Sequence, residues 1–244
     1  VFSGSTASLG SDVAFAVPLD ITGATITVNG SGTFTNTVAL TDTNVTFSGS
    51  GTFNNALTLT NAGLTFGNGA VFGGNVTFAG NEDTLTGTHA VTNIFTFNNH
   101  VDINSAVLKL NGSGTGVNNF IFNGTVHTNP AANTATIAMS GSGSGVKNIS
   151  FNQHLTTSKD TLISSSASGT SNISILSGVS GNKNLTLLGV GDGRRQFILS
   201  GALAFNSLTV SAGGAASNNL LSINSNTLQT WNINRANGGT MTMA

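Results

Sequence analysis

Phenylalanine recurs along the chain at regular intervals, and an apolar residue follows each one four positions later. The spacings are 19, 19, 19, 25, 25 and 29 residues, for Phe15, Phe34, Phe53, Phe72, Phe97, Phe122 and Phe151. The apolar residues at the second position are Leu19, Val38, Leu57, Val76, Val101, Val126 and Leu155. Self-similarity of this kind is the sequence signature of a repeat architecture, in which each unit stacks on the next.

Apolar and polar residues alternate within each unit, which is the pattern of β-strands that bury one face. Eight positions after the first four phenylalanines stand residues that favour turns, namely Gly23, Asp42, Asn61 and Gly80. A second alternating segment and a pair of glycines follow, so we predict two strands and two turns in each unit. Stacked in parallel, these units would place phenylalanine on phenylalanine and close one continuous core.

The predicted fold is all-β, a single parallel β-solenoid with coils of 19 to about 29 residues. The general rule for parallel crossovers makes it right-handed. We expect an irregular lead-in over residues 1–12 and a solenoid with the phenylalanine ladder over 13–158. Residues 159–244 should continue the same solenoid in 23-residue units, because Leu176-Ser-Gly178 is repeated as Leu199-Ser-Gly201.

The longer units carry extra residues, which we expect at corners of the solenoid. These segments are 81–84, 112–116 and 128–133, and they leave the register of the strands unchanged. Corner insertions are what a solenoid tolerates best, and binding often resides in such loops.

Charged residues are sparse, at 6% of 244 residues, and the formal net charge is −1. The seven Lys and Arg residues are scattered, which excludes the basic footprint of proteins that bind nucleic acids or anionic lipids. No apolar run is long enough for a membrane-spanning helix, so no membrane insertion is expected. The chain has no cysteine, which excludes disulfides and thiolate metal sites, and we predict no cofactor.

Two sets of repeats carry a resemblance to known families. The 19-residue Phe-x-Asn-x-Val units and the later Leu-Ser-Gly units resemble autotransporter-associated β-strand repeats and the repeats of filamentous haemagglutinin-like adhesins. The resemblance covers nearly the whole chain. It implies a right-handed β-helix that is secreted or displayed on a bacterial surface, in families that use one scaffold for adhesion, fibre building and display.

Asparagine occupies the position after several of the ladder phenylalanines, at Asn54, Asn98, Asn123 and Asn152. Stacked one coil apart, at about 4.8 Å, such side chains can hydrogen-bond along the solenoid axis. We therefore predict an asparagine ladder with a structural role.

Three of the four histidines fall in register with other polar residues. His100 and His154 share a column but lie two coils, or roughly 10 Å, apart, which is too far for one metal ion. Asp102 and His127 are predicted to face each other in adjacent coils. A weak surface ion pair is the favoured interpretation, ahead of a catalytic dyad.

The densest polar loop, residues 189–196, contains Asp192, Arg194 and Arg195. Its two guanidinium groups are candidate contacts for an anion or an acidic glycan, although a solvated glycine corner is the commoner role of such a segment. Trp231 is the single tryptophan and a candidate surface contact for a sugar. The eight acidic residues are spread along the chain, and Glu82 and Asp83 are the only adjacent pair.

The favoured functional hypothesis is a non-catalytic, extracellular structural solenoid, either a fibre component or the stalk of a surface adhesin. Its partner would be a flanking solenoid of the same polypeptide or a second copy stacked head to tail, because uncapped coils expose strand edges. A host or matrix glycan or protein is a further expected partner. The alternatives are a glycan-active enzyme that uses corner loops such as 81–84 or 190–196, and a carbohydrate-binding module.

Overall fold

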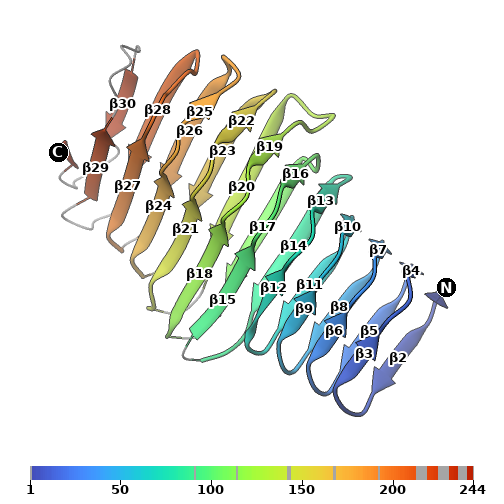
Figure 1. Cartoon of the computed structure of the whole chain (residues 1–244). Helices are drawn as coiled ribbons and strands as arrows, with labels where there is room; N and C mark the ends of the chain where they lie inside the picture. Colours follow the sequence, from blue (N-terminus) through green and yellow to red (C-terminus); the bar gives the residue numbers. More distant parts are fainter. Residues whose placement is uncertain are drawn as a thin grey trace.

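The computed structural model is an all-β molecule built from three parallel sheets (Figure 1). It describes residues 2–90, 92–113, 115–141, 144–166, 169–191, 193–212, 219–224, 231–235 and 241–243. Successive coils stack in sequence order from one end of the molecule to the other. The described part of the chain contains no helix that is long and apolar enough to cross a membrane. The predicted parallel β-solenoid is confirmed, and it is three-sided.

As far as β25, each coil contributes one strand in turn to three sheets, which we name A, B and C; beyond β25 the described strands alternate between sheets B and C. Sheet A consists of β1 (Phe2–Ser3), β4 (Leu19–Thr22), β7 (Val38–Thr41), β10 (Leu57–Thr60), β13 (Val76–Ala79), β16 (Val101–Ile103), β19 (Val126–Thr128), β22 (Leu155–Thr157) and β25 (Val179–Ser180). Sheet B consists of β2 (Thr6–Leu9), β5 (Thr25–Val28), β8 (Asn44–Phe47), β11 (Gly63–Phe66), β14 (Glu82–Gly87), β17 (Val107–Gly112), β20 (Thr134–Ser140), β23 (Asp160–Ser165), β26 (Asn184–Gly189), β28 (Ser207–Ala212) and β30 (Trp231–Arg235). Sheet C consists of β3 (Val13–Phe15), β6 (Gly32–Phe34), β9 (Gly51–Phe53), β12 (Gly69–Phe72), β15 (Thr92–Phe97), β18 (Val117–Phe122), β21 (Lys147–Phe151), β24 (Ser171–Ile175), β27 (Arg195–Ser200), β29 (Asn219–Asn224) and β31 (Met241–Met243).

The prediction of two strands in each unit is wrong, because the chain turns a corner between each ladder phenylalanine and the apolar residue four positions on. Phe34 ends β6 in sheet C, whereas Val38 begins β7 in sheet A. Between them, the side-chain oxygen of Asn36 accepts a hydrogen bond from the Thr37 backbone N–H at 3.0 Å. Asparagine competes in this way for backbone groups that a strand would use, and the strand ends.

The seven ladder phenylalanines stack in the order that their spacing predicts. Consecutive ring centroids lie 4.5 to 5.4 Å apart, with ring planes within 18° of parallel. Phe15, in the first complete coil, is partly buried, and the other six are buried. Beyond Phe151 the same column continues as Ile175, Leu199 and Ile223. The core is therefore continuous through both sets of repeats.

Two further pairs of stacked aromatic rings lie in the core, one on strands of sheet B and one on strands of sheet C. Phe47 and Phe66 stack with centroids 5.1 Å apart, and Phe95 and Phe120 stack at 4.8 Å. Gly51 faces the ring of Phe66, and a Cβ atom there would overlap that ring. The glycine pairs of the repeat thus make room for aromatic side chains in addition to forming a turn.

The predicted turn column lies at the corner between sheets A and B. Gly23, Asp42, Asn61 and Gly80 all adopt positive φ angles, of 64°, 49°, 51° and 86°. Glycine adopts this left-handed backbone freely, and Asn and Asp tolerate it better than other residues. The turn residues at this column are confirmed.

One predicted boundary needs correction. The irregular lead-in predicted over residues 1–12 is wrong, because β1 pairs with β4 and β2 pairs with β5 in register. The segment 81–84 does hold extra residues, because Thr60 pairs with Ala79 at an offset of 19 residues and Gly63 pairs with Thr84 at an offset of 21. Strand β14 begins within this segment, at Glu82. The solenoid continues past residue 158, since β23 pairs with both β20 and β26.

A column of buried polar side chains supports the longer corners between sheets B and C. Its members are register partners in successive coils, in the order Asn93, Asn118, Lys147, Ser171 and Arg195. All five are buried. Burial lowers the pKa of Lys147. Asn93, Lys147 and Arg195 donate to the corner carbonyls of His89, Gly145 and Gly169, so this column ties the corner loops to the core.

Candidate functional site

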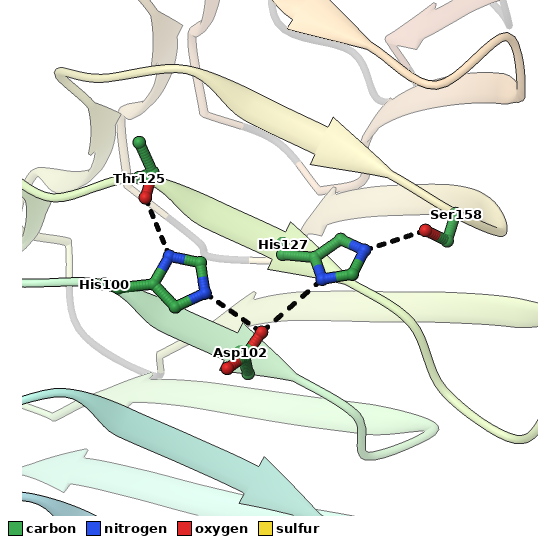
Figure 2. Close-up of polar contacts among 5 residues, drawn as sticks. All are labelled: His100, Asp102, Thr125, His127 and Ser158. Carbon is green, nitrogen blue, oxygen red and sulfur yellow. Dashed lines mark hydrogen bonds and ion pairs between the residues drawn. The ribbon is translucent and has the colours of Figure 1, made fainter.

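Two histidines share one carboxylate on the outer face of sheet A (Figure 2). Asp102 on β16 and His127 on β19 are register partners, and His100 directly precedes β16. Asp102 Oδ1 lies 3.0 Å from His100 Nε2 and 3.5 Å from His127 Nδ1. The predicted pairing of Asp102 with His127 is confirmed, and His100 joins it because residues two apart on a strand share a face.

A hydroxyl group contacts the second ring nitrogen of each of these two histidines. Thr125 Oγ1 lies 2.7 Å from His100 Nδ1, and Ser158 Oγ lies 2.7 Å from His127 Nε2. An ionised carboxylate only accepts hydrogen bonds, so a neutral His100 places its Nε2–H toward Asp102, and its Nδ1 atom accepts the hydrogen bond of the Thr125 hydroxyl. His127 Nδ1 lies within ion-pair distance of Asp102 Oδ1, beyond ordinary hydrogen-bond length. The five residues form one chain of polar contacts, which we call the sheet A relay, from Ser158 through the carboxylate to Thr125.

A second histidine–serine pair lies further along the same sheet. His154, directly before β22, has its Nε2 atom 2.8 Å from Ser180 Oγ, and its Nδ1 atom 3.3 Å from the Ser177 carbonyl oxygen. A carbonyl is also only an acceptor, so Nδ1 of His154 carries the proton. The two pairs therefore present the same imidazole nitrogen to a serine, one supported by a carboxylate and the other by a neutral carbonyl.

The sheet A relay is accessible to solvent. The side chains of His100, Asp102 and His127 are 39%, 34% and 31% exposed. Ion pairs with this exposure contribute about 0–1 kcal/mol to stability, so the relay is a small term in folding. Within the described residues, no group of three or more His, Cys, Asp or Glu side chains is placed to hold a metal ion.

The predicted contact loop divides into exposed and buried parts. Arg194 is exposed. Arg195 is buried, with guanidinium nitrogens donating to the carbonyls of Gly169 at 2.7 Å and Val190 at 2.6 Å. The prediction of a surface contact for Arg195 is therefore wrong, because the strand alternation turns this side chain inward. Asp192 lies outside the described residues, as does the side chain of Trp231 on β30.

The adjacent acids Glu82 and Asp83 point to opposite sides of β14. Glu82 is exposed and accepts a hydrogen bond from Lys109 Nζ at 2.7 Å. Asp83 is buried, and its Oδ1 atom accepts a hydrogen bond from the Ala62 backbone N–H at 2.9 Å. Burial raises the pKa of Asp83 to about 7, against the opposing effect of backbone N–H groups. The two carboxylates do not form a shared acidic site.

Asparagine ladders run along two sides of the solenoid. The predicted ladder after the phenylalanines is present for Asn98, Asn123 and Asn152, with Nδ2 of Asn123 donating to Asn98 at 3.2 Å and Nδ2 of Asn152 to Asn123 at 2.8 Å. Asn54 is not part of it, because Gly73 occupies the same position in the coil between Asn54 and Asn98. A second ladder on sheet C joins Asn119, Asn148 and Asn172, with bonds of 2.6 and 2.7 Å. It lines a shallow groove of about 340 Å³ together with Gln196 and other outward residues of sheet C.

Comparison with known proteins adds no relative. No family model, curated protein or solved structure matches this chain.

Proposed function

We propose that this chain is a structural β-solenoid of the extracellular space or the bacterial cell surface, serving as a fibre component or as the stalk of an adhesin. The observation that carries the proposal is the in-register stacking of parallel strands, in three sheets as far as β25 and in sheets B and C as far as β31. Strand pairing joins each coil to the next, and the stacked phenylalanines add contacts along the same axis. Such an array resists extension along its length, as a stalk or fibre must.

The chemistry of the surface supports the same proposal. Only 6% of the residues are charged, and side chains of Thr, Asn and Ser cover much of the outer strand faces. The resemblance of the repeats to those of autotransporter passengers and filamentous haemagglutinin-like adhesins points in the same direction. In this proposal the scaffold bears load or displays other segments and is not an enzyme.

The proposed partner is another solenoid coil. A coil without a neighbour exposes unpaired strand edges, which must be covered. More of the same polypeptide or a second copy stacked head to tail can provide the cover, and head-to-tail contacts of identical copies generate an open filament. A host or matrix glycan or protein is the second kind of partner in the proposal.

Electron microscopy of the purified chain at increasing concentration tests the proposal. We expect filaments whose diffraction shows the coil repeat of about 4.8 Å along the filament axis. Monomers alone at high concentration would remove the filament version, and single-molecule stretching would then test the stalk version. Turnover of acidic polysaccharides, assayed with and without calcium, would contradict a non-catalytic role.

The groove on sheet C favours a second candidate function, the binding of a neutral polysaccharide. Asn148 and Asn172 each donate one Nδ2–H along the ladder, to Asn119 and Asn148, and the second N–H of each carboxamide is the proposed donor to a ligand. A sugar chain offers hydroxyls at repeated intervals to such a row. We expect glycan-array binding to be lost in Asn148→Ala and kept in Asn123→Ala, which alters the ladder outside the groove.

A further inference from the structure

Ser158 lies at the end of the sheet A relay in an arrangement that activates hydroxyl groups. Its Oγ atom is 2.7 Å from His127 Nε2, and His127 Nδ1 is 3.5 Å from Asp102 Oδ1 (Figure 2). A nucleophile within hydrogen-bond reach of a base, which is itself oriented by a third group, is the structural signature of covalent chemistry. We propose that Ser158 is a nucleophile that accepts the acyl group of a small activated ester.

The proposed step uses the tautomer of His127 that carries its proton on Nδ1. The Asp102 carboxylate, 3.5 Å from Nδ1, favours that tautomer electrostatically, and it leaves the lone pair of Nε2 for the Ser158 hydroxyl. Ser158 Oγ attacks the ester carbonyl carbon while its proton passes to His127 Nε2. The bond from that carbon to the leaving oxygen then breaks, and the leaving group takes the proton from Nε2. The products are an acyl ester on Ser158 and a free alcohol, with no oxidant or reductant needed.

Asp102 acts in this proposal as a positioning residue. Its carboxylate lies 3.5 Å from His127 Nδ1, where it stabilises the positive charge that the ring acquires when it takes the serine proton. His100 fixes the carboxylate in turn, through the contact of 3.0 Å with Oδ1. The exposed third of the His127 side chain leaves the site open to a small ester from the solvent side.

Ser180 provides an internal comparison for Ser158, because it also contacts a histidine on sheet A. Ser180 Oγ lies 2.8 Å from His154 Nε2, but His154 Nδ1 faces the Ser177 carbonyl instead of a carboxylate. A carboxylate stabilises the imidazolium more than a neutral carbonyl does. Loss of the triad carboxylate costs up to about 10⁴-fold in proteases, so we expect Ser158 to react at least about tenfold faster than Ser180.

Labelling of the full chain with a fluorophosphonate probe and, separately, with p-nitrophenyl acetate tests the proposal. Peptide mass spectrometry would measure the rate of adduct formation at Ser158 and at Ser180 in the same sample. We expect labelling of Ser158 to dominate in the wild type and to be lost in His127→Gln. Equal rates at the two serines, or labelling of neither, would overturn the proposal.

Variants of Asp102 distinguish a positioning role of its carboxylate from a general effect on the structure. Asp102→Asn should lower the rate at Ser158 to that at Ser180 and leave Ser180 unchanged, while Asp102→Glu should restore part of the difference. His89→Gln is the matched control, because His89 is exposed and lies at a corner away from sheet A. Circular dichroism confirms folding of each variant. A rate at Ser158 that does not respond to Asp102→Asn would exclude the role of the carboxylate.

Discussion

Phe97 and Phe122 lie face to face in adjacent coils, with ring centroids 4.5 Å apart and planes 5° from parallel. Phe97 also stacks on Phe72 at 4.6 Å and meets the edge of Phe78 at 6.2 Å. Its side chain is fully buried. A single ring thus links three successive coils, which makes the centre of the ladder the most sensitive point of the fold.

Truncation of this ring should be costly. We expect Phe97→Ala to lower the free energy of unfolding by about 3–5 kcal/mol, through lost burial and the cavity left between neighbouring rings. Urea denaturation followed by circular dichroism measures the loss. Val71→Ala is the control, because Val71 is 43% exposed on the outer face of β12, and it should change stability by less than about 0.5 kcal/mol. Equal effects of the two substitutions would contradict a stabilising ladder.

Gly51 should tolerate no added methyl group. A Cβ atom at this position would lie only 3.0 Å from the Cδ1 and Cζ atoms of Phe66 and closer still to Cε1. We expect Gly51→Ala to destabilise the protein by about 1–3 kcal/mol through overpacking. Thermal unfolding measures this effect, with Gly10→Ala as the control because nothing lies within 4 Å of its Cβ position.

A second substitution distinguishes overpacking from a change in backbone flexibility. Phe66→Leu removes the ring that the new methyl group would strike. If the ring is the cause, the double variant Gly51→Ala with Phe66→Leu should be more stable than the sum of the single effects predicts. If the two changes in stability are strictly additive, the loss in Gly51→Ala comes instead from the backbone of β9.

The parts of the fold that repeat were predictable from the sequence, and the parts that depend on corners were not. The spacing of 25 residues between Asp102 and His127 equals that between Phe97 and Phe122, so their register could be read directly. The corner after Phe34 was missed, because Phe34 and Val38 stand four residues apart and so remain in phase with the period of two across three polar residues. The structure shows the bend, since β6 ends at Phe34 and β7 begins at Val38.

Two site residues illustrate the same limit. Ser158 contacts His127 across 31 residues of sequence from the corner that follows β22, and many serines could have filled that position. Arg195, by contrast, carried a usable signal. It alternates with Phe197 and Leu199, both buried, and so had to face inward. The charge of Arg195 favoured a position on the surface, whereas the alternation of inward and outward residues along β27 correctly predicts a buried side chain.

Asp83 should make the stability of the protein depend on pH. Its pKa in the folded protein is about 7, above the ordinary value of 3.8, so the folded chain keeps a proton that the unfolded chain releases. Stability should therefore fall, by roughly 1–3 kcal/mol, as the pH rises from about 4 through about 7. Urea denaturation at several pH values measures the slope.

The neutral variant Asp83→Asn isolates this contribution. Its carboxamide oxygen can still accept the hydrogen bond from Ala62, but the side chain carries no charge to bury. We expect Asp83→Asn to lose less stability than the wild type over the same rise in pH. Asp20→Asn, at an exposed position, should follow the wild-type curve. Parallel curves for the wild type and Asp83→Asn would show that Asp83 is not the group responsible.

Arg195 should not be replaceable by lysine. Its guanidinium donates to the Gly169 carbonyl through Nη1 and to the Val190 carbonyl through Nη2, so one side chain ties two corner loops together. A lysine ammonium lacks this planar fork and would leave a buried carbonyl unpaired, at a cost of about 1–3 kcal/mol. We expect Arg195→Lys to lower the urea midpoint by a corresponding amount. Arg194→Lys should have no effect because Arg194 is exposed. A matching loss in both variants would show that the effect does not come from the buried guanidinium fork.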